Sequence, residues 1–287
     1  MLDDPDVKAG VTFVGNATTL LRLGSFTLLT DPNFVPAGTR VYLGKGAWTR
    51  RLLDPAMTMG ELPPLDGVVL SHLHGDHFDG VAKAELPSAT PIFTTPQARR
   101  KLRQWKFRAV RGLPTWESYD WARGRERLRI TAVPGRHGPG PAEWLLPDVM
   151  GSVIELRVDD VCRLRVYITG DTLNRPFLAQ VPERCGDIDA MIVHLGGTRV
   201  FGMLLTMDAR QGVDLTELIR PRLTVPVHHD DYTVFTSPLS DFVERAREHG
   251  LTGIQPIERG STLELPVRPA GQVSRPGLAS GAQDSDR

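Results

Sequence analysis

Three histidines and one aspartate lie close together in the segment 72–77, which reads HLHGDH. Alternate residues of an extended segment point the same way, so His72 and His74 can converge on one cation. The turn that follows can direct Asp76 and His77 toward a neighbouring cation. Imidazole and carboxylate groups are ligands that zinc, iron and manganese accept, so the pattern predicts two half-sites for divalent cations in one turn.

Two cations need more ligands than one turn supplies, and the ends of other predicted strands carry suitable residues. His137 follows the predicted strand 128–133 in the segment PGRHGPG, where little side-chain bulk obstructs a cation. Asp171 follows the predicted strand 164–169, directly after Gly170. The glycine lets the backbone approach closely, and the aspartate can bridge two cations.

Three further histidines stand at strand ends. His228 and His229 follow the predicted strand 223–227, and they compete for the last ligand position because adjacent strand residues face opposite sides. His194 ends the predicted strand 188–194. We expect it either to pair with a buried polar group or to contact a substrate.

The order of these residues resembles the metallo-β-lactamase superfamily. That superfamily carries an aspartate at an early strand end, an H-x-H-x-D-H turn, a lone histidine, a lone aspartate and a final histidine. Three sequence segments resemble the branch that contains N-acylphosphatidylethanolamine phospholipase D and L-ascorbate-6-phosphate lactonase. They are LLTDPNF, ELPPLDGVVLSHLHGDHFD and TGDT. The resemblance covers about residues 10–265 and implies a four-layer αββα sandwich of mixed α/β class. The matching residues are Asp31, His72 to His77, His137, Asp171 and His228.

The resemblance also implies a role for each matching side chain. It implies two divalent metal ions, with Zn²⁺ expected first and Mn²⁺ or iron as alternatives. Asp31 would orient a ligand histidine from behind, while Asp76, His77 and Asp171 would act in catalysis with a hydroxide that bridges the cations. The family register favours His228 over His229. The implied ligands are His72, His74 and His137 for the first cation, and Asp76, His77 and His228 for the second, with Asp171 between them.

The reaction expected of such a centre is hydrolysis of an ester-type bond in a small-molecule or lipid-like substrate. The sequence segments that resemble the phospholipase favour a phosphodiester substrate, as do the arginines, which could bind its phosphate. A lactone or carboxylic ester is the close alternative. A nuclease and a non-hydrolytic metal redox or sensor protein are less favoured, and balanced charge argues against the nuclease. The basic residues that raise the nuclease hypothesis are Arg99, Arg100, Lys101, Arg103, Lys106, Arg108 and Arg111.

The elements that must position these residues follow a mixed order in which strands outnumber helices. Three short strands joined by turns open the chain and predict an antiparallel meander. Helical patterns occur between later strands. Expected strands span 11–15, 18–23, 26–31, 68–70, 91–94, 128–133, 152–158, 164–169, 188–194, 223–228, 253–257 and 261–265, and expected helices span 96–105, 208–219 and 238–249.

Two long segments lack a clear period and are candidate functional loops. Residues 32–60 are punctuated by Pro and Gly and are too long for an ordinary connection, so they are a candidate wall for a pocket. Residues 138–151 carry Trp144 in an apolar stretch between prolines. Trp144, like His194 and His229, is a candidate for substrate contact.

Composition bounds the remaining possibilities. The 287 residues carry 34 basic and 34 acidic side chains, so net charge gives no reason to expect nucleic acid or an anionic membrane as a partner. Two cysteines without CxxC spacing exclude a disulfide framework and a thiolate zinc site. No apolar run is long enough for a transmembrane helix, and no signal peptide is evident, so we expect a cytoplasmic protein. We expect one domain over 1–267 and a disordered tail over 268–287. A homo-oligomer is an alternative to a monomer.

Overall fold

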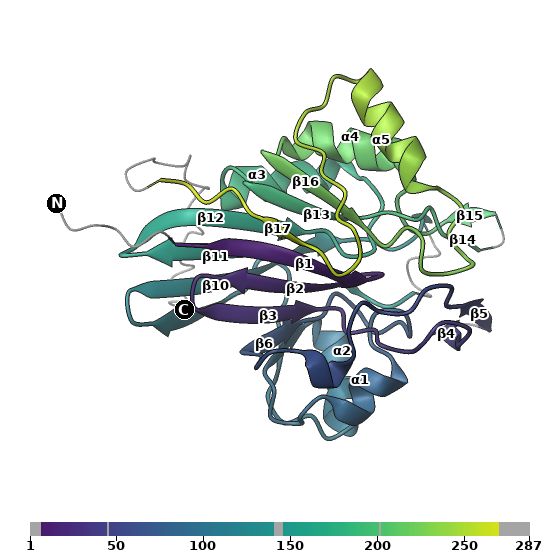
Figure 1. Ribbon diagram of the computed structural model, residues 1–287, viewed down its shortest axis with the longest axis horizontal. Coiled ribbons are helices and arrows are strands. Elements are labelled where there is room, and N and C mark those ends of the chain that lie inside the picture. Colours follow the sequence, from purple (N-terminus) through teal and green to yellow (C-terminus); the bar gives the residue numbers. More distant parts are fainter. Residues whose placement is uncertain (1–6, 45, 141–145, 201, 270–287) are drawn as a thin grey trace, which may run out of the picture.

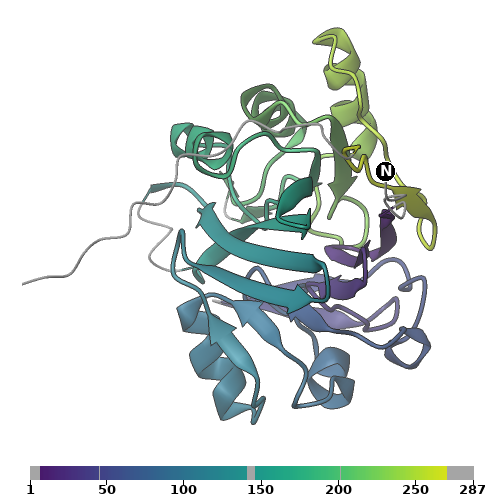
Figure 2. The ribbon, with the colours of Figure 1, turned by 90° about the vertical axis from the view of Figure 1, so that its left-hand side faces the viewer.

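Two β-sheets pack face to face, and helices cover the outer face of each (Figure 1, Figure 2). The computed structural model describes residues 7–44, 46–140, 146–200 and 202–269. One continuous apolar core fills the space between the two sheets. A further core lies between the first sheet and its helices, and another between the second sheet and its helices. This is the four-layer αββα arrangement that the family resemblance implies.

The first sheet has seven strands in the order β17-β1-β2-β3-β6-β7-β8. Its first three strands in the chain form the expected antiparallel meander, and β3, β6, β7 and β8 run parallel to one another. The meander turns at Gly24, whose φ of 56° lies in the left-handed region. The strands are β1 (Ala9–Gly15), β2 (Thr18–Leu23), β3 (Phe26–Thr30), β6 (Gly67–Val69), β7 (Ile92–Thr94), β8 (Val110–Gly112) and β17 (Thr262–Glu264).

The second sheet has six strands in the order β16-β13-β12-β11-β10-β9. Four consecutive strands pair antiparallel, and the last three in the chain run parallel. Every residue of the parallel strands β13 and β16 is buried, because both faces of this sheet are covered. The strands are β9 (Ser118–Arg123), β10 (Glu126–Gly135), β11 (Val149–Val158), β12 (Val161–Ile168), β13 (Ala190–His194) and β16 (Leu223–Val227).

The helices divide between the two outer faces, with α1 and α2 on the first sheet and α3, α4 and α5 on the second (Figure 1). Side-chain caps start several of them; Thr95 accepts from the backbone of Ala98 and precedes Pro96 at the first helical position. The helices that the described residues build are all too short or too polar to span a bilayer. They are α1 (Gly80–Glu85), α2 (Pro96–Gln104), α3 (Gln180–Cys185), α4 (Ala209–Ile219) and α5 (Leu239–Glu248), with 3-10 turns η1 (Met59–Glu61) and η3 (Pro176–Ala179).

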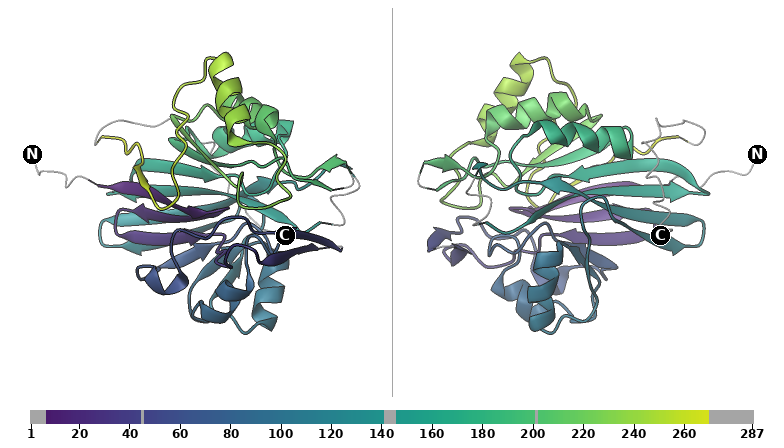
Figure 3. Two further views of the ribbon diagram at one scale, coloured as in Figure 1. Left: turned by 45° about the vertical axis from the view of Figure 1, so that its right-hand side comes forward. Right: turned by 180° about the vertical axis from the view of Figure 1, so that it is seen from behind.

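Two small hairpins project at the same end of the sandwich (Figure 1, Figure 3). The first pairs β4 (Arg40–Gly44) with β5 (Ala47–Arg50), and the second pairs β14 (Arg199–Val200) with β15 (Met203–Leu204). The segment 32–60, expected as an irregular loop, therefore contains a hairpin. Its pattern is hard to recognise because its exposed aromatic side chains face solvent and not a core.

The C-terminal part of the chain departs from two predictions. Residues 253–257 and 261–265 do not form a β-pair; β17 pairs with β1 instead, and Ile254 forms only an isolated bridge. The boundary after residue 267 is also too early, because the buried Arg268 donates a 2.7 Å hydrogen bond to Asp189. The rest of the expected tail, from residue 270, lies outside the described residues.

Arg51 ties the end of the first hairpin to the body of the protein. Its side chain is 0% exposed and donates to the Asn33 side chain (2.7 Å), the Leu53 carbonyl (2.8 Å) and Asp231 (3.3 Å). Replacing it with methionine, which is of similar size, removes these hydrogen bonds and the buried ion pair with Asp231. We expect Arg51→Met to lower the free energy of unfolding by about 3–5 kcal/mol, measured by urea denaturation. The exposed Arg127→Met is the control, and a comparable loss there would contradict the assignment.

Candidate metal centre

The candidate ligands converge because the strands that carry them end at one edge of the sandwich. The turn 72–77 follows β6, Asp171 follows β12, and His228 follows β16. In each sheet the parallel strands end at the same edge, so residues just beyond them meet there. Gly170 has a φ of 62°, and a Cβ at this position would lie 3.0 Å from the Ser71 side chain, which explains the glycine before Asp171.

A first cluster contains only histidines. His72, His74 and His137 are all buried, and each offers a ring nitrogen that lies within 4.8 Å of the other two. His72 Nε2 lies 2.9 Å from His74 Nδ1. Three imidazoles with converging nitrogens are a ligand set typical of zinc and other borderline divalent cations.

A second cluster, next to the first, combines two carboxylates with two imidazoles. It contains Asp76, His77, Asp171 and His228, all buried, with ligand atoms again within 4.8 Å of one another. His77 Nε2 lies 3.2 Å from Asp171 Oδ2, and His228 Nε2 lies 3.4 Å from Asp76 Oδ2. His229, its competitor in the sequence, lies in neither cluster and packs beside Phe13.

Outer partners fix the ring nitrogen that three of these histidines present. His137 Nδ1 donates to the Leu205 carbonyl (2.8 Å), and His228 Nδ1 donates to the Leu195 carbonyl (3.1 Å). His77 Nδ1 donates to Asp31 Oδ2 at 3.0 Å. Because carbonyls and carboxylates only accept, these rings carry their proton on Nδ1 and turn Nε2 toward the cluster.

Asp31 is the shared acceptor behind the H-x-H-x-D-H turn. Besides His77, it accepts from the Ser71 backbone (2.7 Å) and the Ser71 hydroxyl (2.8 Å). That hydroxyl has a single proton, which goes to Asp31, so its oxygen accepts from His72 Nδ1 at 2.9 Å. Asp31 (φ 34°) and His228 (φ 60°) both adopt the left-handed backbone region, a strain typical of functional sites.

Electrostatics keeps the first cluster neutral. Burial lowers the pKa of His72 well below 6.5, and the nearby His77 lowers it further. Burial, followed by the neighbouring His137, lowers the pKa of His74 to about 3, and burial also lowers the pKa of His137. All three rings therefore keep a lone pair available at neutral pH, which is the form that binds a cation.

The second cluster is held in charged form. Burial opposes ionisation of Asp171, but the rings of His228 and His77 outweigh it and hold its pKa well below the ordinary value. Burial likewise disfavours a charged His77, yet Asp171, Asp76 and Asp31 raise its pKa well above 6.5. Burial disfavours ionised Asp31, while His77 lowers its pKa to about 2. The carboxylates thus carry negative charge toward the space between the ligand atoms.

Orphaned polar atoms show that the clusters suit a cation. Within the described part of the chain, Asp76 Oδ1, Asp171 Oδ1 and His77 Nε2 are buried and make no hydrogen bond. Unsatisfied buried polar atoms are rare in proteins and need an explanation. Two divalent cations would supply it, because every orphaned atom here is a metal ligand by type.

A small cavity of about 70 Å³ borders both clusters. His74 and His137 of the first cluster line it, as do Asp76 and Asp171 of the second. The other described lining residues are apolar or neutral, and come from the two hairpins and the segment after residue 145. They are Leu43, Gly44, Ala47, Leu146, Thr198 and Leu205. Segment 32–60 therefore does form a wall of the site, as predicted.

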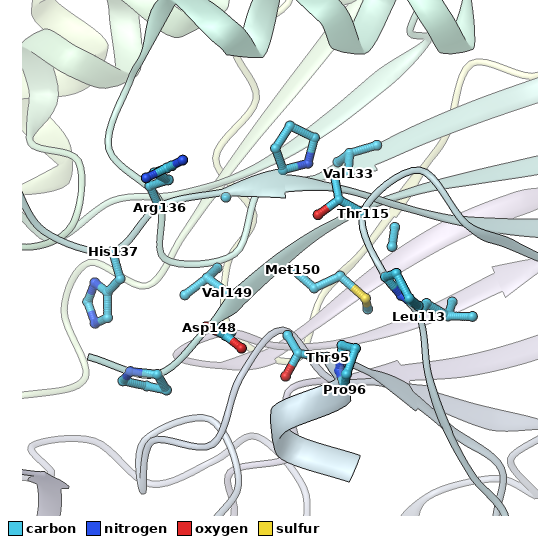
Figure 4. Close-up of a pocket in the computed structure, with 15 residues that line it drawn as sticks. Thr95, Pro96, Leu113, Thr115, Val133, Arg136, His137, Asp148, Val149 and Met150 are labelled. Atoms are coloured by element: carbon cyan, nitrogen blue, oxygen red, sulfur yellow. The ribbon is translucent and has the colours of Figure 1, made fainter. Parts of the chain in front are cut away.

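A larger hollow of about 500 Å³ adjoins the centre at His137 (Figure 4). His137 and Arg136 lie at one end of it and Leu113 at the other. His137 is the one member of the two clusters that lines it. The larger hollow therefore touches the two clusters at His137 and lies beside the small cavity.

The candidates for substrate contact do not line the small cavity in the described part of the chain. His194 is 0% exposed and does not line the cavity, because it lies behind His77. His229 points toward Phe13, away from both clusters. Trp144 lies outside the described residues. The sequence reasoning missed Ser71, for which the one signal was its position directly before His72.

The family assignment agrees with this geometry. The model of the beta-lactamase superfamily domain matches residues 27–229. A UPF0173 metal-dependent hydrolase from Pyrococcus furiosus is 23% identical over 255 residues, covering 89% of this chain and 99% of the relative. One from Carboxydothermus hydrogenoformans is 25% identical over 263 residues, with the same shares covered. An isothiocyanate hydrolase from Delia radicum gut bacteria has the same fold, with a TM-score of 0.76 and 20% identity over 90% of this chain and 99% of that structure.

Fold and site thus define a metal-dependent hydrolase. The chain belongs to the beta-lactamase superfamily. The resemblance seen in the sequence is confirmed at the level of that superfamily.

Cation binding must displace protons from the second cluster, so affinity should depend on pH. The raised pKa of His77 stabilises the metal-free protein below 6.5, and this contribution is lost as pH rises through the raised value. A cation competes with the same proton. We therefore expect the rise in melting temperature on adding Zn²⁺ to grow from about pH 6 to about pH 8, measured by thermal unfolding of chelator-treated protein. An increase that is the same at both pH values would contradict this.

Proposed function

We propose that this hydrolase uses two divalent cations to cleave an ester-type bond in a small molecule. The single observation that carries the proposal is the pair of adjacent buried clusters that border one cavity. His72, His74 and His137 would hold one cation. Asp76, His77, Asp171 and His228 would hold the other.

Divalent cations in such a centre polarise the attacked carbonyl or phosphoryl oxygen and lower the pKa of water from about 15.7 to about 7. The chain's own residues supply the rest. Asp76 and Asp171 both line the cavity and are ionised there, and each has a carboxylate oxygen that makes no hydrogen bond within the described residues. A carboxylate oxygen of Asp76 or Asp171 that does not hold a cation can accept the proton that leaves the attacking water.

The cavity lining bears on the substrate. The sequence favours a phosphodiester because of its arginines, but among the described lining residues of the small cavity there is no arginine or lysine. Leu43, Leu146 and Leu205 surround the reacting position instead. A phosphodiester would bring its negative charge next to these leucines, whereas a carboxylic ester or lactone is uncharged. We therefore favour a carboxylic ester or lactone as the substrate over a phosphodiester.

A rate comparison tests the proposal. The zinc-loaded protein is assayed on an aryl carboxylic ester, an aryl lactone and an aryl phosphodiester of matched leaving group. An aryl isothiocyanate is added because a hydrolase of that class shares the fold. We expect turnover of the ester or lactone to exceed that of the phosphodiester. Faster phosphodiester cleavage would restore the phospholipase-like function, and no hydrolysis of any probe would contradict the proposal.

A nuclease and a metal redox or sensor protein would behave differently from this hydrolase. A nuclease would bind nucleic acid with an affinity that falls steeply as salt rises. An iron redox or sensor protein would retain iron in preference to zinc and show no hydrolysis. The proposal also places the protein in the cytoplasm, which is supported by the free thiols of Cys162 and Cys185.

A further inference from the structure

His194 is a buried histidine that the proposed metal centre does not use. It ends β13 and is 0% exposed. Its ring stacks on that of His77, with centroids 6.0 Å apart and an interplanar angle of 15°. It therefore lies directly behind a residue of the second cluster.

The polar contacts of this ring lead to Asp31. His194 Nδ1 lies 3.3 Å from the Thr169 hydroxyl, which also accepts from the His194 backbone at 3.0 Å. Nε2 makes no hydrogen bond within the described residues, and it lies 3.5 Å from Asp31 Oδ2. That separation is slightly longer than an ordinary hydrogen bond, and the carboxylate is the acceptor within reach.

Proton counting indicates how the ring is oriented. Asp31 can only accept, so a neutral His194 ring is stable beside it when Nε2 carries the proton. Nδ1 is then an acceptor, and the Thr169 hydroxyl can satisfy it by turning its one proton from the Gly170 carbonyl, 2.9 Å away, to the ring. In the opposite tautomer two lone pairs would face each other in a buried site, at a cost that burial increases.

We propose that His194 is a positioning residue for the metal centre, acting through Asp31 on His77. Thr169, His194, Asp31 and His77 form a continuous chain across the ends of three strands and the H-x-H-x-D-H turn. Ser71 holds both oxygens of Asp31, and His194 Nε2 approaches Oδ2, so this oxygen stays directed at His77 Nδ1. The inference rests on the proposed function, because His77 matters here as a cation ligand.

The test measures zinc affinity as well as turnover. Full-length protein carrying His194→Leu, His194→Gln, Asp31→Asn or the double change His194→Leu with Asp31→Asn is titrated with Zn²⁺ against a chromophoric chelator. We expect His194→Leu to weaken one of the two cations by about 10–100-fold, the cost typical of losing an outer partner. His194→Gln should recover part of this loss. The double variant should bind no more weakly than Asp31→Asn alone, because both act on the same ring.

Controls separate this role from a general loss of structure. His249→Leu removes an exposed histidine bonded to Glu217 and should leave both affinities unchanged. NMR of labelled histidine in the metal-free protein should show a slowly exchanging His77 Nδ1 proton in the wild type, and faster exchange of that proton in His194→Leu. If His194→Leu does not fold, His194→Gln and Thr169→Val give the same comparison.

Several results would overturn the inference. They are wild-type affinity for both cations in His194→Leu, losses that add in the double variant, or a third zinc equivalent that disappears with His194. The last result would make His194 a ligand in its own right. A wild-type protein that binds no cation would instead contradict the proposed function, so the two failures are distinguishable.

Discussion

Asp171→Ala is expected to abolish turnover and to release cations from the protein. Asp171 supplies a carboxylate 3.2 Å from His77 Nε2 and 3.7 Å from His228 Nε2, and it lines the cavity shared by both clusters. Its removal takes a ligand atom from the second cluster and leaves Asp76 and Asp31 as the carboxylates beside the buried imidazoles. The rate should fall by more than the factor of about 10–100 that is typical of removing a hydrogen-bond partner behind a metal ligand. The rate is measured on the probe that the wild type hydrolyses best, and the zinc content of the variant is measured alongside.

A structural control accompanies that variant. Cys162→Ala removes a buried thiol on β12 that contacts neither cluster, so it should barely change the rate. Circular dichroism should show that Asp171→Ala keeps its secondary structure, because strand pairing does not depend on this side chain. Full activity in metal-depleted Asp171→Ala protein would defeat the account.

His74→Ala is expected to have a comparable effect through the first cluster. His74 contributes one of three converging ring nitrogens and lines the cavity, so its loss leaves two ligands from the protein. Two imidazoles bind zinc far more weakly than three. We expect turnover to vanish and one zinc equivalent to be lost, measured by element analysis after dialysis.

The remaining cation distinguishes this variant from Asp171→Ala. Because the second cluster keeps all four of its members, His74→Ala should retain part of its zinc. Retention of both equivalents in His74→Ala would show that the three histidines do not act as a ligand set.

The ligand set could be predicted because each member follows an apolar strand. Asp171 and His137 stand where an apolar run gives way to glycine or proline, a local signal that the structure confirms as a strand end. The choice between His228 and His229 could not be made from alternation alone. It depended on the resemblance, and the structure places His228 in the cluster because the backbone turns there with a φ of 60°.

The surroundings of the site were less predictable. His194 was expected at a strand end, but whether it faced the cavity or the interior depends on how two sheets stack, which no local pattern encodes. The hairpin 40–50 was missed because Tyr42 and Trp48 are exposed, so its strands show no buried face. The pairing of β17 with β1 joins residues from opposite ends of the chain, and sequence proximity wrongly favoured a partner in 253–257.

Substrate preference was predicted least securely, for a physical reason. Arginines were counted along the chain, whereas charge at the reacting centre depends on which side chains face the cavity. The described lining places leucines there instead. A fold of this kind supports several hydrolytic reactions, so the choice among them rests on the cavity.

The central claim is that two buried clusters hold two divalent cations side by side. The most direct test is the metal content of the full chain, reconstituted with Zn²⁺, dialysed and analysed for metal and protein. The account predicts two tightly held equivalents per chain in the wild type, with a loss in both Asp171→Ala and His74→Ala. A wild-type chain that retains no zinc, or variants that retain as much as the wild type, would contradict it.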